Sequence, residues 1–250
     1  MKSKSTIAFR IAIVVFIVSV LALGFIGFQY WIQDRAYQEA QEHFDVSDVE
    51  DNYLNAKVDW DALRQKNEDI VAWVFVPDTK INYPVVQGDN NEEYLNKSFD
   101  GSEGMLASAG TIFLDSANSP DFSDENNALY GHHMNDGSMF ACLADWVDSK
   151  KFNENRIMYV YTPSANYLLT TFSVVKTTGD DPIVQTTFAQ KESFTEYIQA
   201  KIDRSVVPQK VQKIKAENVE KSFMFCTCEY SQQDGRIIVY ASVTQTAIQS

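Results

Sequence analysis

An uninterrupted apolar segment near the N-terminus constrains this chain more than any other feature of its 250 residues. The segment, Ile11–Phe28, contains no charged side chain, and its length approaches the ~20 residues with which a helix crosses a bilayer. Tyr30 and Trp31 follow it, at the position of an interfacial aromatic belt. We therefore expect residues 11–31 to form a transmembrane anchor. A cleaved signal peptide is the alternative, but the segment is long for one and no A-x-A-like site directly follows it.

The distribution of charge predicts where the rest of the chain lies. All basic residues before position 28 precede the apolar segment, whereas Asp34 and Glu39 follow it. The positive-inside rule then predicts that residues 1–10 are cytoplasmic and the remainder is extracytoplasmic. The net charge is −13, and because a negative surface repels polyanions, nucleic acid is not expected as a partner. We expect a single-pass protein of the cell membrane.

Two regions follow the anchor. Residues 32–56 are polar, with Tyr37, Ala40 and Phe44 at helical spacing, so we expect a helical linker or stalk there. Residues 57–250 are expected to form one extracytoplasmic domain.

The pattern of this domain is mostly β. Short runs of β-branched and aromatic residues alternate with turn residues, and about eight such runs imply a closed barrel or a sandwich. They are residues 70–77, 81–87, 111–115, 127–131, 156–162, 166–175, 222–228 and 236–243. Helices are predicted after Asp59, over residues 138–147 with Ser138 as the cap, and over residues 191–203.

Cysteine provides the first candidate for chemistry. An exported chain with three cysteines leaves at least one of them unpaired. Cys228 ends an apolar run, and a hairpin through the turn-prone residues before Arg236 would bring that arginine beside it. A neighbouring guanidinium favours the reactive thiolate and can stabilise an oxyanion. The alternative is a buried cysteine and a solvated arginine. Cys226 and Cys228 share a strand face, and we expect two thiols there and no disulfide.

Two adjacent histidines, His132 and His133, follow Gly131 where a β run ends. A strand end that leads into a loop can direct a side chain into a cleft. Surface hydrogen bonding is the alternative for such a pair. Neither a C-x-x-C nor an H-E-x-x-H pattern is present, so no metal and no other cofactor is expected. An exported cysteine, a histidine at a strand end and an arginine one hairpin away together suggest an activated nucleophile.

Several motifs in order along the chain resemble one family, the sortases, and within it class B. The sequence Met224-Phe225-Cys226-Thr227-Cys228 resembles the sortase signature T-L-x-T-C, although its T-L part differs, and Arg236 follows eight residues later. The class B histidine loop is similar to residues 130–140, in which the histidine right after glycine, His132, is the catalytic one. Further matches lie at residues 67–73, 81–87, 94–95 and 110–115.

The resemblance implies a mainly β fold, an eight-stranded sortase barrel with an N-terminal helical extension and a helix before the cysteine strand. It also implies a cysteine transpeptidase that cleaves a C-terminal sorting motif of secreted proteins after Thr and transfers the protein to an amine of the peptidoglycan precursor of Gram-positive bacteria. Cys228 is then the nucleophile, His132 the acid and base, and Arg236 the stabiliser of the oxyanion.

By the same resemblance, four residues are expected to bind substrate: Asn91, Leu95, Thr227 and Glu229. Family members often carry a small polar residue where Cys226 stands, so substrate selection is expected to differ. The expected partners are secreted proteins with a sorting motif, the precursor amine, and membrane lipid around the N-terminal helix.

Three other interpretations are open. A pilus-polymerising sortase would transfer to a lysine of another protein subunit, and a DPF/W-type lid motif that would favour it is not found. A non-catalytic, membrane-tethered β-domain that binds wall components would leave Cys228 unreactive. A papain-like peptidase is disfavoured because its cysteine precedes its histidine, whereas His132 precedes Cys228 here.

Overall fold

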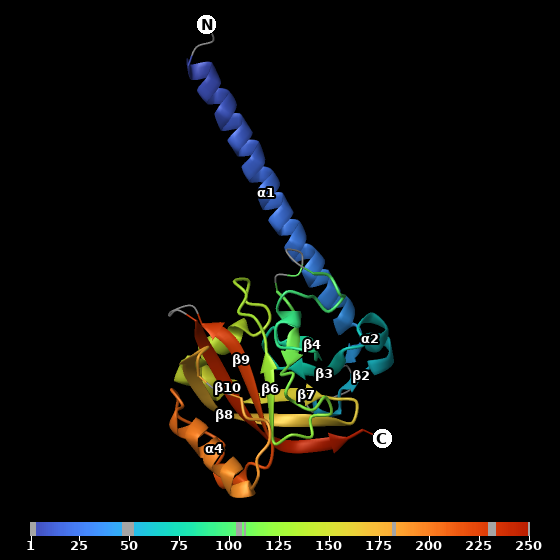
Figure 1. The fold of residues 1–250 in the computed structure, drawn as a ribbon, viewed down its shortest axis with the longest axis vertical. Coiled ribbons are helices and arrows are strands. Elements are labelled where there is room, and N and C mark those ends of the chain that lie inside the picture. The colour runs from blue at the N-terminus through green and yellow to red at the C-terminus, as the bar shows by residue number, and fades with distance from the viewer. Residues whose placement is uncertain are drawn as a thin grey trace.

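The computed structural model describes residues 4–46, 53–103, 107, 109–181, 184–229 and 234–249. It contains a long N-terminal helix and a β-barrel (Figure 1). The helices are α1 (Lys4–Gln41), α2 (Trp60–Lys66), α3 (Ser149–Glu154) and α4 (Lys191–Asp203), with short 3-10 turns η1 (Tyr53–Asn55), η2 (Glu93–Leu95), η4 (Ala141–Val147) and η5 (Ala216–Asn218). The strands are β1 (Phe44–Asp45), β2 (Lys57–Val58), β3 (Ile70–Phe75), β4 (Asn82–Val86), β5 (Ile112–Leu114), β6 (Asn126–Tyr130), β7 (Ile157–Tyr161), β8 (Ala165–Thr178), β9 (Ser222–Glu229) and β10 (Gly235–Ile248).

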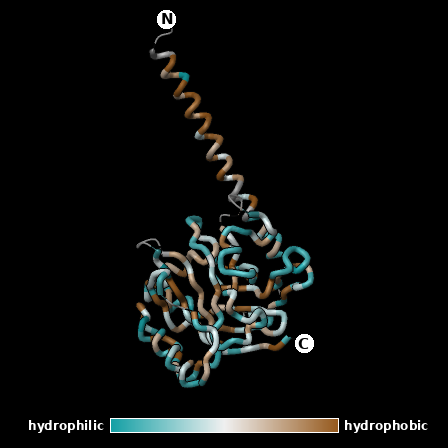
Figure 2. Tube along the Cα trace, viewed as in Figure 1, coloured by the Kyte–Doolittle hydropathy of each residue, from teal (hydrophilic) through white to brown (hydrophobic). Residues whose placement is uncertain are grey.

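Helix α1 passes without a break through the apolar segment and reaches the barrel. Its stretch Ile7–Phe28 is long and apolar enough to cross a membrane, and this stretch is not buried against the rest of the protein. Figure 2 shows the hydrophobic colour concentrated on the part of α1 that projects from the barrel. Near its other end, Tyr37 and Ala40 are buried, as is Phe44 just beyond the helix. Tyr37 and Ala40 are three residues apart and so lie on one face of the helix, and this face packs on the barrel together with Phe44 of β1.

Eight strands close into a barrel in the order β10-β8-β7-β3-β4-β5-β6-β9. The eight-stranded barrel predicted from the sequence is therefore confirmed. Most neighbours are antiparallel, and β4–β5 and β6–β9 are the parallel pairs. Closure pairs every barrel strand on both sides, and the interior of an eight-stranded barrel is filled by side chains. Here the fill includes Val74, Val160, Phe223 and Phe225, all 0% exposed.

Helix α4 covers a second apolar layer on the outside of the barrel. Phe194 and Ile198 of the helix pack on alternate residues of three neighbouring strands, which include Ala128, Met224 and Ile238. The predicted helix before the cysteine strand is confirmed with the same bounds, 191–203. The outward-facing rows of β6, β9 and β10 are thus buried beneath α4 over most of their length.

Two predicted helix caps have different outcomes. Asp59 caps α2 as predicted, because its Oδ1 accepts a hydrogen bond from Ala62 N at 3.0 Å. The helix predicted over residues 138–147 is wrong in its start and its type, since the structure has the 3-10 helix η4 from residue 141, after Phe140. Ser138 does not cap it, because its backbone N and Oγ both donate to Asp136 Oδ1 at 2.9 and 2.6 Å. This local turn competes with helix formation.

Candidate active site

The three predicted reactive residues stand at the ends of three neighbouring rows of side chains. Side chains alternate between the two faces of a strand, so Cys228 continues the outward row of Met224 and Cys226 in β9. His132 follows the outward row of β6, and Arg236 begins that of β10. The three residues therefore meet where the covered face beneath α4 opens to solvent.

Register places Cys228 and Arg236 directly opposite each other in the antiparallel β9–β10 pair. Directly opposed residues have their Cβ atoms ~5 Å apart on one face of a sheet, so the predicted hairpin and its juxtaposition are confirmed. On the other side of β9, the parallel ladder pairs Tyr130 with Cys226. The pairing extends one residue beyond β6, because Gly131 N donates to Cys226 O at 3.1 Å. His132 therefore lies level with Cys228 on the neighbouring strand.

Glycine at position 131 allows this close approach. A Cβ added there would lie 2.4 Å from Ile112 Cδ1 and 2.7 Å from Phe140 Cδ2, both far inside ordinary van der Waals contact. Ile112 and Phe140 are fully buried. The backbone of Gly131 is therefore packed tightly against the core, and this packing fixes the position of the His132 backbone at the end of β6.

These residues line one cleft of about 310 Å³. Its walls contain Asn91, Leu95, Phe113, Tyr130, Gly131, His132, Gly179, Cys226, Thr227, Cys228 and Arg236. Three of the four residues predicted to bind substrate therefore lie in the same cleft as the three predicted reactive residues. The fourth, Glu229, ends β9, and its side chain lies outside the described residues. Among the described residues there is no cluster of His, Cys, Asp and Glu that is arranged to hold a metal ion.

The histidine and the arginine are each held by a neighbour. His132 Nε2 lies 2.7 Å from the carbonyl oxygen of Leu95, so this nitrogen carries a proton in the arrangement described. Arg236 Nη2 forms an ion pair with Asp234 Oδ1 at 2.7 Å, and its Nη1 donates to Gly235 O at 3.0 Å. These contacts use part of the five N–H donors of a guanidinium, and the others are available to a ligand in the cleft.

The two cysteines of β9 differ in reactivity although they share a face. Cys226 is 3% exposed, and burial raises the pKa of its thiol to about 12, against a smaller opposing effect of Arg236. At neutral pH this thiol is protonated and is a poor nucleophile. Cys228 is half-buried at the cleft, and both cysteines are free. The expected pair of thiols is therefore confirmed, and exposure favours Cys228 as the reactive one.

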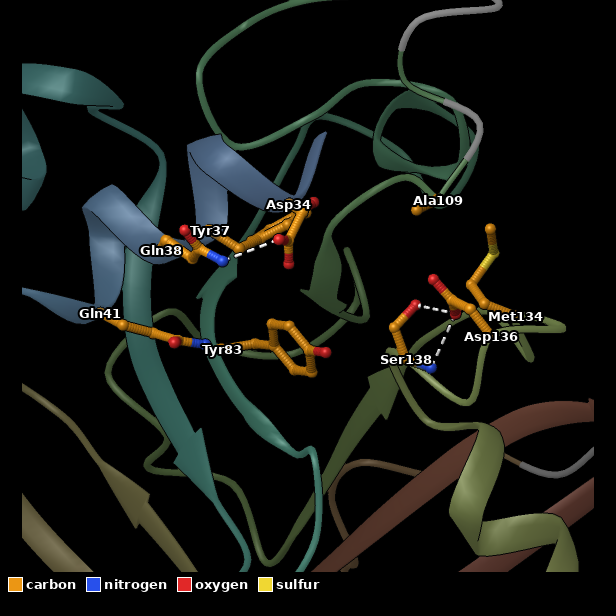
Figure 3. Close-up of a pocket in the computed structure, with 9 residues that line it drawn as sticks. All are labelled: Asp34, Tyr37, Gln38, Gln41, Tyr83, Ala109, Met134, Asp136 and Ser138. Carbon is orange, nitrogen blue, oxygen red and sulfur yellow. Dashed lines mark hydrogen bonds between the residues drawn. The ribbon is translucent and has the colours of Figure 1, made fainter. Parts of the chain in front are cut away.

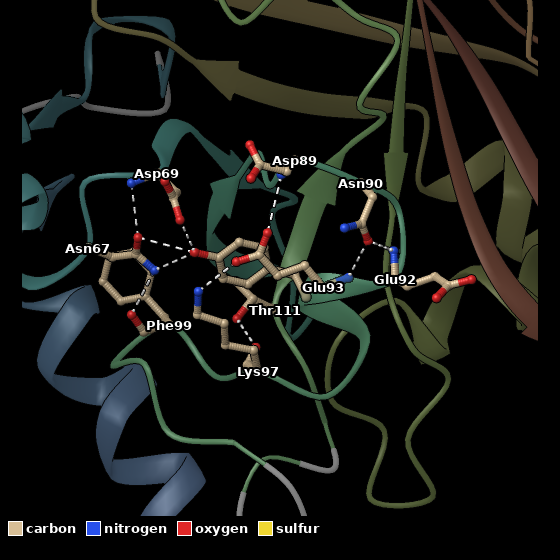
Figure 4. Close-up of polar contacts among 10 residues, drawn as sticks. Asn67, Asp69, Asp89, Asn90, Glu92, Glu93, Lys97, Phe99 and Thr111 are labelled. Carbon is tan, nitrogen blue, oxygen red and sulfur yellow. Dashed lines mark hydrogen bonds and ion pairs between the residues drawn. The ribbon is translucent and has the colours of Figure 1, made fainter.

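A polar network braces the short turn η2, which carries Leu95. Tyr94 donates from its hydroxyl to Asp69 Oδ2 at 2.5 Å, and its carbonyl accepts from Thr111 N at 3.0 Å. Lys97 donates to Glu93 Oε1 at 2.7 Å across the same turn. Figure 4 shows the polar side chains gathered around it. Because Leu95 O holds His132, this network also fixes the catalytic candidate.

Several residues of the cleft were not predicted from the sequence. Tyr130 lies two residues before His132 and hence on the same strand face, a signal that the alternation alone provides. Its hydroxyl donates to Asp115 Oδ2 at 2.9 Å, and Asn91 Nδ2 donates to the same oxygen at 3.0 Å. Burial and this carboxylate raise the pKa of Tyr130 well above its usual value. Phe113 and Gly179 also line the cleft, and no local pattern singles them out.

Comparison with known proteins agrees with this geometry. The family model of the sortase domain matches residues 74–244. Sortase B of Staphylococcus aureus is 27% identical over 240 residues, which cover 94% of this chain and 96% of that protein. Sortase B of Listeria monocytogenes is 32% identical over 177 residues, which cover 71% and 70%.

Solved structures agree in fold over most of the chain. Sortase B of Bacillus anthracis, in complex with AAEK1, has a TM-score of 0.71 at 30% identity and covers 86% of this chain and 98% of its own. The S. aureus sortase B–substrate complex has a TM-score of 0.66 at 28% identity and covers 90% and 94%. With the barrel, the cleft and the signature in place, this chain belongs to the sortase family of transpeptidases and is a class B sortase.

Proposed function

We propose that this sortase works through Cys228 as nucleophile, His132 as acid and base, and Arg236 as stabiliser of the reacting carbonyl. The observation that carries the proposal is their convergence on one cleft from the ends of three adjacent strand rows. A thiol, an imidazole and a guanidinium at one opening supply the three parts that acyl transfer to and from a thiol requires.

In the first step the Cys228 thiolate attacks the carbonyl carbon of a peptide bond. The tetrahedral intermediate collapses with cleavage of the C–N bond, and His132 donates a proton to the departing amine. A thioacyl-enzyme remains. In the second step an incoming amine attacks the thioester carbonyl, gives its proton to His132, and displaces the Cys228 thiolate. The product is a new amide, and the enzyme returns to its starting protonation state.

Arg236 acts on the charge that develops in both steps. Its guanidinium lies across the strand pair from Cys228, where an N–H donor can bind the carbonyl oxygen as it becomes an oxyanion. The pairing with Asp234 limits the rotation of the side chain before substrate arrives. A donor oriented in advance costs little reorganisation during the reaction.

The proposed substrate is a C-terminal sorting motif of a secreted protein, cleaved after Thr, and the proposed acceptor is an amine of the peptidoglycan precursor. The cleft volume suits a short peptide segment. A solved structure of S. aureus sortase B is described as a substrate complex, and this likeness supports substrate binding by this chain.

The proposed placement is that of a single-pass membrane enzyme. Residues 11–31 serve as the anchor, residues 32–56 as the linker and residues 57–250 as the catalytic domain, outside a cytoplasmic N-terminus of residues 1–10. The exposed apolar stretch of α1 supports this placement. An enzyme held in this way meets secreted proteins as they leave the membrane.

The proposal is tested with the full chain in detergent micelles and a library of Thr-containing peptides, with product masses as the measurement. We expect cleavage after Thr in a subset of peptides and transfer of the N-terminal fragment to an added amine. Cys228→Ala should abolish both, whereas the matched variant Cys142→Ala, at a free cysteine outside the cleft, should retain them. Transpeptidation by Cys228→Ala would contradict the mechanism, and an inert wild-type chain that still binds wall fragments would favour a non-catalytic domain.

A further inference from the structure

The membrane-proximal helix and the catalytic histidine approach each other on one side of the barrel. The His132 loop, defined here as residues 131–140, leaves β6 and returns to the barrel at η4. The last turns of α1 pack near this loop and near β4 (Figure 1). Tyr37 of α1 lines the pocket between the helix and this loop, and it is 6% exposed.

The first connection runs from Tyr37 through Tyr83 to the end of the loop. The two rings meet edge to face, with centroids 5.4 Å apart at 85°. The hydroxyl of Tyr83 accepts a hydrogen bond from Met139 N at 3.2 Å. Met139 has a left-handed φ of 55°, a conformation that a non-glycine residue keeps only when its surroundings enforce it. Tyr83 is therefore part of what holds the loop in its shape.

The second connection runs from Tyr37 to the histidine ring itself. Its hydroxyl donates to the carbonyl oxygen of Gly110. Gly110 has φ +56°, and a Cβ at that position would lie only 2.6 Å from Leu95 O, so its backbone is pressed against Leu95. The same Leu95 oxygen lies 2.7 Å from His132 Nε2. One hydroxyl on α1 thus supports the backbone that carries the partner of the catalytic imidazole.

Packing alone does not join the helix to the loop. A cavity of about 70 Å³ lies between them, with Asp34 and Gln38 on the helix side and Asp136 and Ser138 on the loop side (Figure 3). Tyr37 also lines this cavity. Side chains that line such a gap lose dispersion contacts with the opposite wall, so the hydrogen bonds and ring contacts of Tyr37 and Tyr83 carry a larger share of the connection.

From these contacts we propose that Tyr37 is a positioning residue for His132, so that the helix which carries the membrane span also completes the geometry of the catalytic site. The inference rests on the proposed role of His132. Tyr37 does not line the cleft as described, so it acts through Leu95 and Met139 and touches no substrate. Its loss should then lower kcat and leave KM nearly unchanged.

The test compares two deletions of a buried tyrosine hydroxyl in the full chain in detergent micelles. Tyr37→Phe removes the hydroxyl that supports Gly110. Tyr161→Phe is the matched control, because Tyr161 is also buried and donates to a carbonyl oxygen, that of Tyr53. Its ring packs on Phe44 and Tyr159, none of which lines the cleft.

We expect Tyr37→Phe to lower kcat by about threefold to tenfold, the effect of one misplaced hydrogen bond, with KM changed less than about twofold. The chain has three histidines, so histidine labelled with ¹³C at Cε1 gives three ring signals, which His43→Gln, His132→Asn and His133→Asn assign. The His132 signal should shift in Tyr37→Phe and stay in place in Tyr161→Phe, while the thermal midpoints of the two variants fall to a similar extent.

The outcomes separate this inference from the proposed function. If His132→Asn retains full transpeptidation, the proposed role of His132 fails. If His132→Asn is inactive but Tyr37→Phe keeps wild-type kcat and an unchanged His132 signal, only the positioning role fails. Equal losses of kcat in Tyr37→Phe and Tyr161→Phe would also overturn it, since general loosening of the fold would then explain both.

Discussion

Substitution of Gly131 by alanine separates the position of His132 from the stability of the barrel. The new methyl group would lie 2.4 Å from Ile112 Cδ1 and 2.7 Å from Phe140 Cδ2, where 3.4–4 Å is ordinary contact. The strand end must therefore move by about 1 Å, because both neighbours are fully buried and closely packed. Overpacking of this kind costs roughly 1–3 kcal/mol of unfolding free energy. A displacement of about 1 Å at a catalytic group costs on the order of 100-fold in rate.

The assay measures kcat with a peptide selected from the library, and unfolding free energy by urea denaturation. Gly101→Ala is the matched control, because Gly101 has φ +82° with no heavy atom within 4 Å of the added methyl. It should lose about 1–2 kcal/mol through its left-handed backbone and keep its kcat. If Gly131→Ala loses stability but retains wild-type kcat, or if Gly101→Ala loses kcat to the same degree, then packing at Gly131 does not position His132.

Three further substitutions address the cleft and one helix cap. Arg236→Lys should lower kcat by on the order of 100-fold, because a lysine ammonium lacks the planar fork of donors with which the guanidinium reaches Asp234 and an oxyanion in fixed geometry. Steady-state kinetics measure this, and unchanged kcat would exclude the oxyanion role. Cys226→Ser should destabilise the fold by about 1–3 kcal/mol, because it buries a hydroxyl in an apolar layer, but should leave iodoacetamide labelling of Cys228 unchanged; slower labelling would show that Cys226 takes part. Asp59→Ala should cost about 1 kcal/mol in urea denaturation through the lost cap of α2, with kcat unaffected, and an unchanged midpoint would contradict the role of the cap.

The strands were predictable from sequence because each carries a clear local pattern. Side chains of residues 222–228 point alternately to the barrel interior and to the layer beneath α4. The turn-prone residues that follow this run predict the hairpin to Arg236. Family resemblance then selected Cys228 and His132 from their neighbours Cys226 and His133. The register that places Arg236 opposite Cys228 follows from that hairpin, so this part of the candidate site was accessible without a structure.

Other features depend on contacts between segments far apart in the chain. Leu95 O holds His132 across 37 residues, and Tyr37 contacts Gly110 across 73. No local periodicity encodes such pairs. The segment after Ser138 has helical spacing, but Asp136 captures the serine in a turn, and a 3-10 helix begins later. Competition among short-range hydrogen bonds of this kind cannot be decided from residue types alone.

If Cys228 carries the acyl group, mass spectrometry should detect the thioacyl-enzyme itself. The full chain in micelles is mixed with a cleaved peptide without added amine, quenched in acid, and digested to locate the adduct. We expect a mass increase equal to the N-terminal peptide fragment, on Cys228 alone, which disappears on addition of the amine acceptor. An adduct on Cys226 or Cys142, or turnover by the Cys228→Ala variant, would contradict it.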